Sequence, residues 1–402
     1  MTRLRYDILA LALMAMTALP LQSAFAAGKI KLSPLRLDVP EKMKKGTFWK
    51  ERTLNVPEGF RANLFASDLG KARFMALGPG GNIYISIPDK DYILVLQDLD
   101  GDGVADRKKV FARGLEKVHG LAFHDGVLFA AGTGKLYRLE DRNGDLRAEK
   151  VEVISEDIPG SGGHWTRTVV IGPDKRLYLS AGSSCNACIE EDQRRAAILR
   201  FPLSGGTGEL FARGLRNSVG LAFHPGTGEL WASDNGRDWL GDDLPPEEIN
   251  RVVRGGDYGW PYCYGEKIVD PSFGTPARCR ETMHPEVEMQ AHSAPLGIAF
   301  GGGLRFPAAF REMLFVAFHG SWNRSEPTGY KLVAIPFIEG RPAGQPQDIV
   351  TGWMAKGKVW GRPVSPIVGA DGALYISDDK AGAVYRISYG AGSEQKTLSR
   401  NE

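Results

Sequence analysis

Histidine and cationic side chains recur beside short alternating strands, and these residue types suit proton transfer next to an anionic ligand. His164 and Arg216 occupy equivalent positions, just before the first strand of two neighbouring repeats. A neutral imidazole can accept a proton near pH 7, and a guanidinium supplies a fixed charge and paired donors for carboxylates. Further candidates precede or follow the paired strands of other repeats: Lys71, Lys117, Trp165, Asn217, Asn235, Gly236, Arg237, His319, Arg362, Asp379 and Lys380.

The elements that must position these residues come from one pattern that recurs six times. An apolar segment leads into a Gly/Pro/Asp turn, and a second short alternating strand follows, as in a β-hairpin. The copies lie at 75–86, 121–131, 169–180, 221–233, 298–317 and 366–377. Repeats of this kind need neighbours to cover their apolar faces, and a closed ring provides them. We therefore predict an all-β fold, a six-bladed β-propeller.

A closed ring of blades predicts where the candidate site residues lie. In a propeller, the loop before the first strand of a blade and the loop after its second strand open on the same face. The residues above should therefore converge on one cationic rim around the central channel.

Composition excludes several classes of protein. The chain has 402 residues with 50 Gly and 24 Pro, and 50 Lys and Arg balance 48 Asp and Glu. No basic field suits nucleic acid, and no later stretch reaches the roughly 20 apolar residues of a membrane span.

Residues 1–26 are typical of a signal peptide, with an Ala-x-Ala ending, so we expect export to a periplasm. We predict one propeller domain at 27–390 with an insertion near 251–290, and a flexible tail at 391–402. Residues 29–57 are expected to supply outer strands that close the ring.

Four cysteines fall into two local pairs, Cys185 with Cys188 and Cys263 with Cys279. Three connectivities are open, and a Cys₄ zinc site is an alternative. Export favours oxidation, so we predict two structural disulfides.

An acidic loop offers a second kind of chemistry. Asp98, Asp100, Asp102 and Asp106 are spaced like calcium-loop ligands, with Gly103 at the sixth position. Lys109 stands where an EF-hand has its closing glutamate, and the flanking residues are typical of strands. A weak structural calcium site and a plain acidic turn are both open.

Longer motifs carry a family resemblance. GGHWTRTVVIGPDKRLYLSAG (162–182), GLRNSVGLAFHPGTGELWASDNGRD (214–238) and GGDYGWPYC (255–263) resemble the soluble quinoprotein sugar dehydrogenases, as do EEINRV (247–252) and HGSWNR (319–324). The L-sorbosone dehydrogenase-like branch, which is related to the aldose and glucose enzymes, is the most similar. The resemblance covers about residues 55 to 388.

This resemblance implies pyrroloquinoline quinone and a calcium ion bound on the channel face. His164 matches the base that takes the sugar hydroxyl proton, and Arg216 matches the arginine that polarises the quinone oxygen. Backbone carbonyls of Gly236 and Arg237 match the calcium ligands. Asn217 and Arg362 match residues that contact the cofactor. The family's fifth-blade lysine has no clear match here, and Arg324 or Lys331 is a possible substitute. Glu247, Glu248 and Tyr258 match a region where some relatives bind a further calcium ion. Trp165, Trp322, Trp360 and Lys380 are additional candidates for contact with the quinone or the sugar.

Departures from the family pattern concern the substrate. Val364 stands where the glucose enzymes have a second basic residue, and Gly163 stands where they have an acidic residue before the base. The resemblance thus implies a periplasmic dehydrogenase of an aldose or a sorbosone-like sugar aldehyde, using an external electron acceptor. The alternatives are a calcium-dependent hydrolase of the lactonase type and a non-catalytic glycan-binding propeller.

Overall fold

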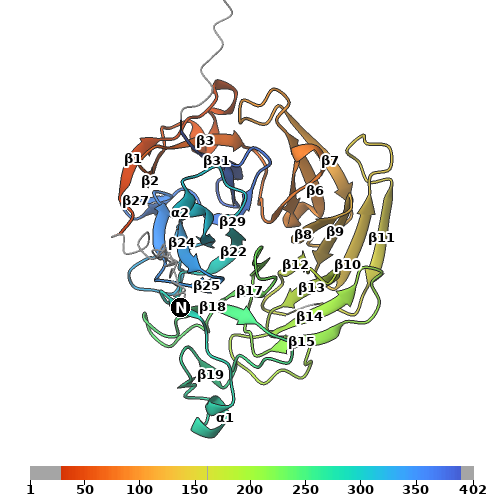
Figure 1. Ribbon diagram of the computed structural model, residues 1–402, viewed down its shortest axis with the longest axis vertical. Coiled ribbons are helices and arrows are strands. Elements are labelled where there is room, and N and C mark those ends of the chain that lie inside the picture. The colour runs from red at the N-terminus through yellow and green to blue at the C-terminus, as the bar shows by residue number, and fades with distance from the viewer. Residues whose placement is uncertain (1–28, 161, 391–402) are drawn as a thin grey trace, which may run out of the picture.

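Short antiparallel strands form six sheets that follow one another around a ring, as blades of a β-propeller (Figure 1). The computed structural model describes residues 29–160 and 162–390, so the expected signal peptide and tail lie outside the described residues. The only helices in the described part are two short ones and several 3₁₀ turns, the helices being α1 (Pro276–Arg280) and α2 (Ala308–Arg311). The prediction of an all-β, six-bladed propeller is confirmed.

Each blade runs from an inner strand at the channel to an outer strand. The first blade contains β4 (Met75–Leu77), β5 (Ile83–Ile87), β6 (Tyr92–Gln97) and β7 (Arg107–Arg113). The second contains β8 (Gly120–His124), β9 (Val127–Gly132), β10 (Lys135–Glu140) and β11 (Lys150–Ser155). The third contains β12 (Arg167–Ile171), β13 (Arg176–Ala181), β14 (Ala197–Pro202) and β15 (Glu209–Arg213).

The other three blades carry the additions to the repeat. The fourth contains β16 (Gly220–Phe223), β17 (Leu230–Asp234), β18 (Glu247–Val252) and β21 (Val287–Met289). The fifth contains β22 (Pro295–Phe300), β23 (Met313–Phe318), β24 (Lys331–Ile338), β25 (Arg341–Pro342) and β26 (Gln347–Val350). The sixth contains β29 (Pro363–Val368), β30 (Leu374–Asp378), β31 (Ala383–Tyr389) and β3 (Phe60–Ala66).

The ring closes through an early strand, since β3 pairs antiparallel with β31 near the end of the chain. We expected residues 29–57 to supply the closing strands, but β3 begins only at Phe60. The earlier strands β1 (Leu32–Arg36) and β2 (Thr53–Pro57) pair with each other, and Asn55 bridges to Thr351 beside the fifth blade. The closing strand is therefore β3, which forms the outer edge of the sixth sheet beside β31.

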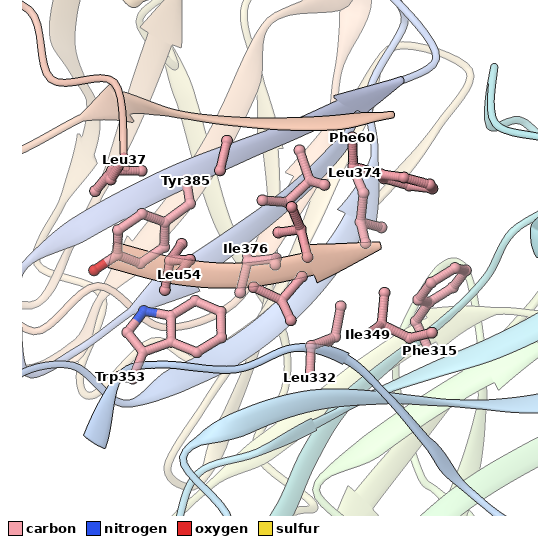
Figure 2. Close-up of a cluster of buried hydrophobic side chains, with 14 of the residues drawn as sticks. Leu37, Leu54, Phe60, Phe315, Leu332, Ile349, Trp353, Leu374, Ile376 and Tyr385 are labelled. Atoms are coloured by element: carbon pink, nitrogen blue, oxygen red, sulfur yellow. The ribbon is translucent and has the colours of Figure 1, made fainter. Parts of the chain in front are cut away.

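A hydrophobic cluster holds this closure together (Figure 2). Leu54 of β2 and Leu64 of β3 are fully buried with Trp353 and with Tyr385 of β31. The rings of Trp353 and Tyr385 lie 5.4 Å apart in an edge-to-face contact. Burial of side chains this large makes the N-terminal strands part of the core rather than an appendage.

Buried hydroxyls join neighbouring blades near the channel. Each is a Ser or Thr on the first or second strand of its blade, and each donates a hydrogen bond to a carbonyl at or just before the first strand of the next blade. The donors and acceptors are Ser86 to His119 (2.7 Å), Thr168 to Val219 (2.6 Å), Ser233 to Leu296 (2.7 Å) and Ser377 to Arg73 (2.6 Å). These bonds fix the loops before the first strands of neighbouring blades relative to one another, and these loops carry the candidate site residues.

The segment between β18 and β21 leaves the ring, as the projection at the lower edge of Figure 1 shows. It contains the β19 (Cys263–Tyr264) and β20 (Ile268–Val269) hairpin and α1, whose Thr275 cap accepts a hydrogen bond from the Arg278 amide. A second small hairpin joins β27 (Met354–Ala355) to β28 (Lys358–Val359). Among the described residues, no helix is both long and apolar enough to cross a membrane.

Candidate functional site

Two adjoining cavities open on the channel face where the pre-strand and post-strand loops meet. The larger has a volume of about 820 Å³ and the smaller about 190 Å³. His164 and Trp322 line both. The larger is also lined by Lys71, Arg73, Lys117, Trp165, His319, Arg362, Asp379 and Lys380, and the smaller by Arg216, Asn217, Asn235 and Gly236.

His164 is held in one tautomer. Its Nδ1 lies 3.0 Å from the Ser183 carbonyl oxygen and 2.8 Å from Ser183 Oγ. Ser183 Oγ in turn donates to the carbonyl of Cys185 at 2.7 Å, so it accepts from the imidazole. Nδ1 therefore carries the hydrogen and Nε2 keeps its lone pair.

The electrostatics around His164 favour the neutral ring. Burial, and then the positive charge of Arg216, lower the pKa of His164 to about 3. A base at this position is thus unprotonated at every pH above the acid range. Space beside the ring is tight, because a Cβ at Gly182 would lie 2.6 Å from His164 Cβ and from Asn217 Oδ1.

Arg216 is buried at the edge of the smaller cavity, and its guanidinium is held from several sides. Nε donates to the Asn186 carbonyl at 2.8 Å, and one terminal nitrogen donates to Asn186 Oδ1 at 2.8 Å. Asp238 pairs with the same guanidinium at 3.3 Å. The amides of Arg216 and Asn217 both donate to the carboxylate of Asp234. The side chain thus presents a fixed charge without freedom to swing away.

A short disulfide loop holds both of these residues. Cys185 and Cys188 are bonded, as are Cys263 and Cys279, so the two predicted disulfides are confirmed. The first loop supplies the Cys185 carbonyl that orients Ser183 and the Asn186 groups that bind Arg216. Ser183 and Asn186 were not predicted from the sequence. The one signal that could have found them is their position, because Asn186 lies within the Cys-Asn-Ala-Cys run and Ser183 two residues before it.

The far wall of the larger cavity is a chain of buried polar groups. Asp379 accepts from His319 Nε2 at 2.9 Å and pairs with Arg73 at 2.8 Å. Burial would raise the pKa of Asp379, yet the His319 hydrogen bond and the Arg73 charge hold it well below the usual range. Burial lowers the pKa of His319 to about 4 despite this carboxylate. Arg362 donates to the carbonyls of His319 and Gly320, which fixes it at the same wall.

Positive charge exceeds negative charge in the larger cavity. Five cationic side chains line it, against the carboxylates of Asp89 and Asp379. Within the described part of the chain, Lys71, Lys117 and Lys380 form no ion pair, and the buried Nε of Arg73 has no hydrogen-bond partner. A ligand with several carboxylates would meet these groups.

One protein-family model matches most of the chain. Residues 54–390 match the TrAA12-like family model. The chain belongs to the TrAA12-like family. A protein of Borreliella burgdorferi described as uncharacterized is 32% identical over 355 residues, covering 84% of this chain and 91% of the relative.

Other similar proteins carry functional names. A pyrroloquinoline quinone-dependent pyranose dehydrogenase of Coprinopsis cinerea is 26% identical, with 83% of this chain and 54% of the relative covered. Quinoprotein glucose dehydrogenase B of Acinetobacter calcoaceticus is 25% identical, with 52% and 54% covered. The match thus spans about half the length of these two proteins.

Solved structures share the fold of this TrAA12-like chain. A Trichoderma reesei AA12 enzyme has a TM-score of 0.73 at 22% identity, with 83% of this chain and 97% of that chain covered. The holo form of the Coprinopsis cinerea pyranose dehydrogenase quinone domain has a TM-score of 0.71 at 23% identity, covering 88% and 98%. At these identities the likeness concerns the propeller itself.

The ring of this TrAA12-like chain brings most of the predicted site residues together, but some lie elsewhere. Trp360 packs edge-to-face against Phe48 and Tyr385 and lines neither cavity. Arg324 turns away from both cavities and donates to the Asp242 carbonyl, with Asp243 at 3.2 Å. Arg237 directs its side chain to Asp270 at 2.7 Å. Glu248 and Tyr258 lie with it around a separate small cavity of about 20 Å³, where burial raises the pKa of both groups.

The acidic loop lies between β6 and β7, away from both cavities. Asp98 accepts hydrogen bonds from the Gly101 and Gly103 amides at 2.8 Å each. Burial, together with the charges of Asp100 and Asp102, raises its pKa. Oxygens of Asp98, Asp100 and Asp106 lie within 4.8 Å of one another. The loop therefore gathers oxygens of the kind that calcium prefers, and its role stays a prediction.

Proposed function

We propose that this protein is a dehydrogenase that oxidises an aldose sugar or a sorbosone-like sugar aldehyde by hydride transfer to pyrroloquinoline quinone. The observation that carries the proposal is His164, a neutral imidazole with a free Nε2, set between a small polar cavity and a large cationic one. The names of two relatives support the cofactor and the substrate class. Export to the periplasm and an external electron acceptor complete the proposal.

The residues present fit the cofactor. Pyrroloquinoline quinone is planar and carries three carboxylates, and the larger cavity offers surplus cations, an unpartnered Arg73 Nε and the indoles of Trp165 and Trp322. Arg362, Lys380 and Asn217 would hold it, with Trp165 against its face. Carbonyls of Gly236 and Arg237 would hold calcium beside it, since calcium takes oxygen ligands. Glu248 and Tyr258 are proposed to bind a further calcium.

The chain's own groups then supply the proton chemistry. When bound, the quinone would accept the hydride from the carbon that is oxidised. His164 Nε2 accepts the hydroxyl proton of that carbon, which a sugar aldehyde carries as its hydrate, while Ser183 holds Nδ1–H so that the ring cannot present its other nitrogen. Arg216 keeps a positive charge next to His164, which keeps the base neutral and favours developing negative charge nearby.

Reconstitution tests the proposal. Protein saturated with calcium and pyrroloquinoline quinone should reduce a dye when an aldose is added. His164→Ala should lower kcat by about 10²- to 10⁴-fold, the usual worth of a general base, with quinone binding largely unchanged. His124→Ala, which alters a histidine at the end of β8 outside both cavities, is the matched control.

Three results would contradict the proposal or one of its parts. Failure of the quinone to bind under saturating calcium would remove the cofactor, and lactone hydrolysis without the quinone would favour the hydrolase alternative. Unchanged turnover in His164→Ala would remove His164 from the base role.

Export is tested separately, by sequencing the N-terminus of protein recovered from the periplasm, where cleavage after Ala26 is expected.

A further inference from the structure

Two large indoles stand exposed together at the mouth of the site. Trp239 is 68% exposed and Trp322 is 65% exposed, and their ring centroids lie 5.1 Å apart at an interplanar angle of 85°. Trp322 lines both cavities, so the pair continues directly from the space beside His164. Exposed aromatic surface next to a cavity costs solvation, and it commonly marks a binding surface.

The pair is attached firmly to the catalytic wall through Asp238. The carboxylate of Asp238 accepts from Asn323 Nδ2 at 3.0 Å and pairs with Arg216 at 3.3 Å. Its amide donates to Asn186 Oδ1 at 2.8 Å. The residues adjacent to each indole are thus tied to Arg216, which sets the distance from the indoles to the reacting position.

The backbone at Trp239 adds a second observation. Its φ is 72°, a left-handed conformation that a bulky aromatic residue rarely adopts. Such strain persists where surrounding contacts hold it, and it concentrates at binding sites. Here the strained turn places the Trp239 ring edge-on to Trp322 and leaves both rings open to solvent.

We propose that Trp239 and Trp322 form a subsite for a second pyranose ring, so that the preferred substrates are oligosaccharides or glycosides rather than single sugars. The C–H face of a pyranose packs on an indole, and the side chains of Asn217 and Asn323, which line the smaller cavity together with Trp322, suit its hydroxyls. This polar border argues against an apolar partner. The inference rests on the proposed function for the ring that reacts at His164.

Binding to the protein without quinone tests the subsite directly. We would titrate glucose, maltotriose and cellotriose by calorimetry and follow the quenching of tryptophan fluorescence. At least one trisaccharide should bind about tenfold tighter than glucose, and Trp239→Ala should remove that difference while Trp239→Phe retains most of it. Trp49→Ala is the control, because Trp49 is 77% exposed but lies near the N-terminal strands.

The outcomes separate the subsite from the dehydrogenase. Equal binding of glucose and both trisaccharides by the wild-type protein would overturn the proposal, as would a trisaccharide preference that Trp239→Ala leaves unchanged. Self-association that Trp239→Ala abolishes would also overturn it, by showing the pair to be a contact between copies. Quinone binding is measured apart, so its failure beside a retained trisaccharide preference removes the dehydrogenase and leaves the subsite.

Discussion

At the scale of single residues, the site depends on which nitrogen of His164 is free and how strongly the ring resists protonation. Ser183 determines the first, through its carbonyl and its hydroxyl. Burial and Arg216 determine the second. An ordinary surface histidine would be half protonated near pH 6.5, whereas His164 stays neutral far below that.

The pH dependence of turnover follows from this. Protonation blocks the base, so activity falls as the pH drops through the pKa of His164. Because that pKa is lowered to about 3, the profile of kcat/KM should show no acid limb near pH 6.5. Arg216→Gln removes a like charge and should move the acid limb upward by roughly one pH unit, in addition to slowing turnover.

Arg254→Gln is the matched control for that profile. The Arg254 side chain is exposed and pairs with Glu209 at the outer edge of the third blade, so the acid limb should not move. An acid limb near pH 6.5 in the wild-type protein, unaffected by Arg216→Gln, would show that a different group titrates.

At the scale of elements, short loops rather than strands carry the catalytic geometry. The Cys185–Cys188 loop follows β13, yet it reaches both the base and the arginine of the next blade. Its disulfide restricts the chain at the point where those contacts originate. The acidic loop is a different kind of connection, because it joins β6 to β7, the third and fourth strands of the first blade.

Opening the first disulfide should therefore affect activity. In Cys185→Ser with Cys188→Ser, Asn186 no longer holds Arg216 rigidly, and kcat/KM should fall by about 10- to 100-fold, as for small misplacements of catalytic groups. The double variant Cys263→Ser with Cys279→Ser is the control. It should lower the unfolding temperature and reduce kcat/KM less than the first pair does, because Cys263 lines the small cavity beside Arg216 but the disulfide contacts neither His164 nor Ser183. Equal losses in both would contradict the positioning role.

The acidic loop makes a prediction about stability. If calcium binds to this loop, saturating calcium should raise the free energy of unfolding by about 1–3 kcal/mol. The double variant Asp98→Asn with Asp106→Asn should lose this calcium-dependent gain. Asp125→Asn, at the exposed turn between β8 and β9, should not. Thermal unfolding with and without chelator measures the effect. An unchanged calcium response in the double variant would identify the loop as a plain acidic turn.

At the scale of the whole molecule, stability depends on closing the ring. The first inner strand, β4, packs against both β8 and β29, so all six inner strands contact their neighbours around the channel. The sixth sheet is complete only when β3 joins β31. Contacts between the two ends of the chain therefore support every blade, including those that carry His164 and Arg216.

Leu64 of β3 tests this closure. Its side chain is fully buried in the same hydrophobic cluster as Trp353 and Tyr385, so Leu64→Ala should lower the free energy of unfolding by about 2–5 kcal/mol. Leu77→Ala is the matched control, because Leu77 of β4 is 37% exposed and should cost no more than about 0.5 kcal/mol. Urea unfolding measures both. Similar small losses would mean that β3 is dispensable for closure.

How much of this was predictable differs between fold and site. Six alternating repeats determined the propeller, because strand periodicity and turn residues are local properties of the chain. The same repeats placed His164, Arg216, Asn217 and Arg362 on one rim. The cysteine spacing predicted both disulfides. The closing strand was placed too early, because strand pairing across the whole chain has no local signature.

What only the tertiary structure decided is the set of partners. No spacing relates Ser183 to the tautomer of His164, Asn186 to Arg216, or Trp239 to Trp322, since these contacts join loops of different blades. The direction of the Arg324 side chain, away from the cavities, likewise could not be predicted from the sequence. Periodicity along the chain determines which face a residue occupies, whereas the packing of six blades around a channel determines what each side chain meets there.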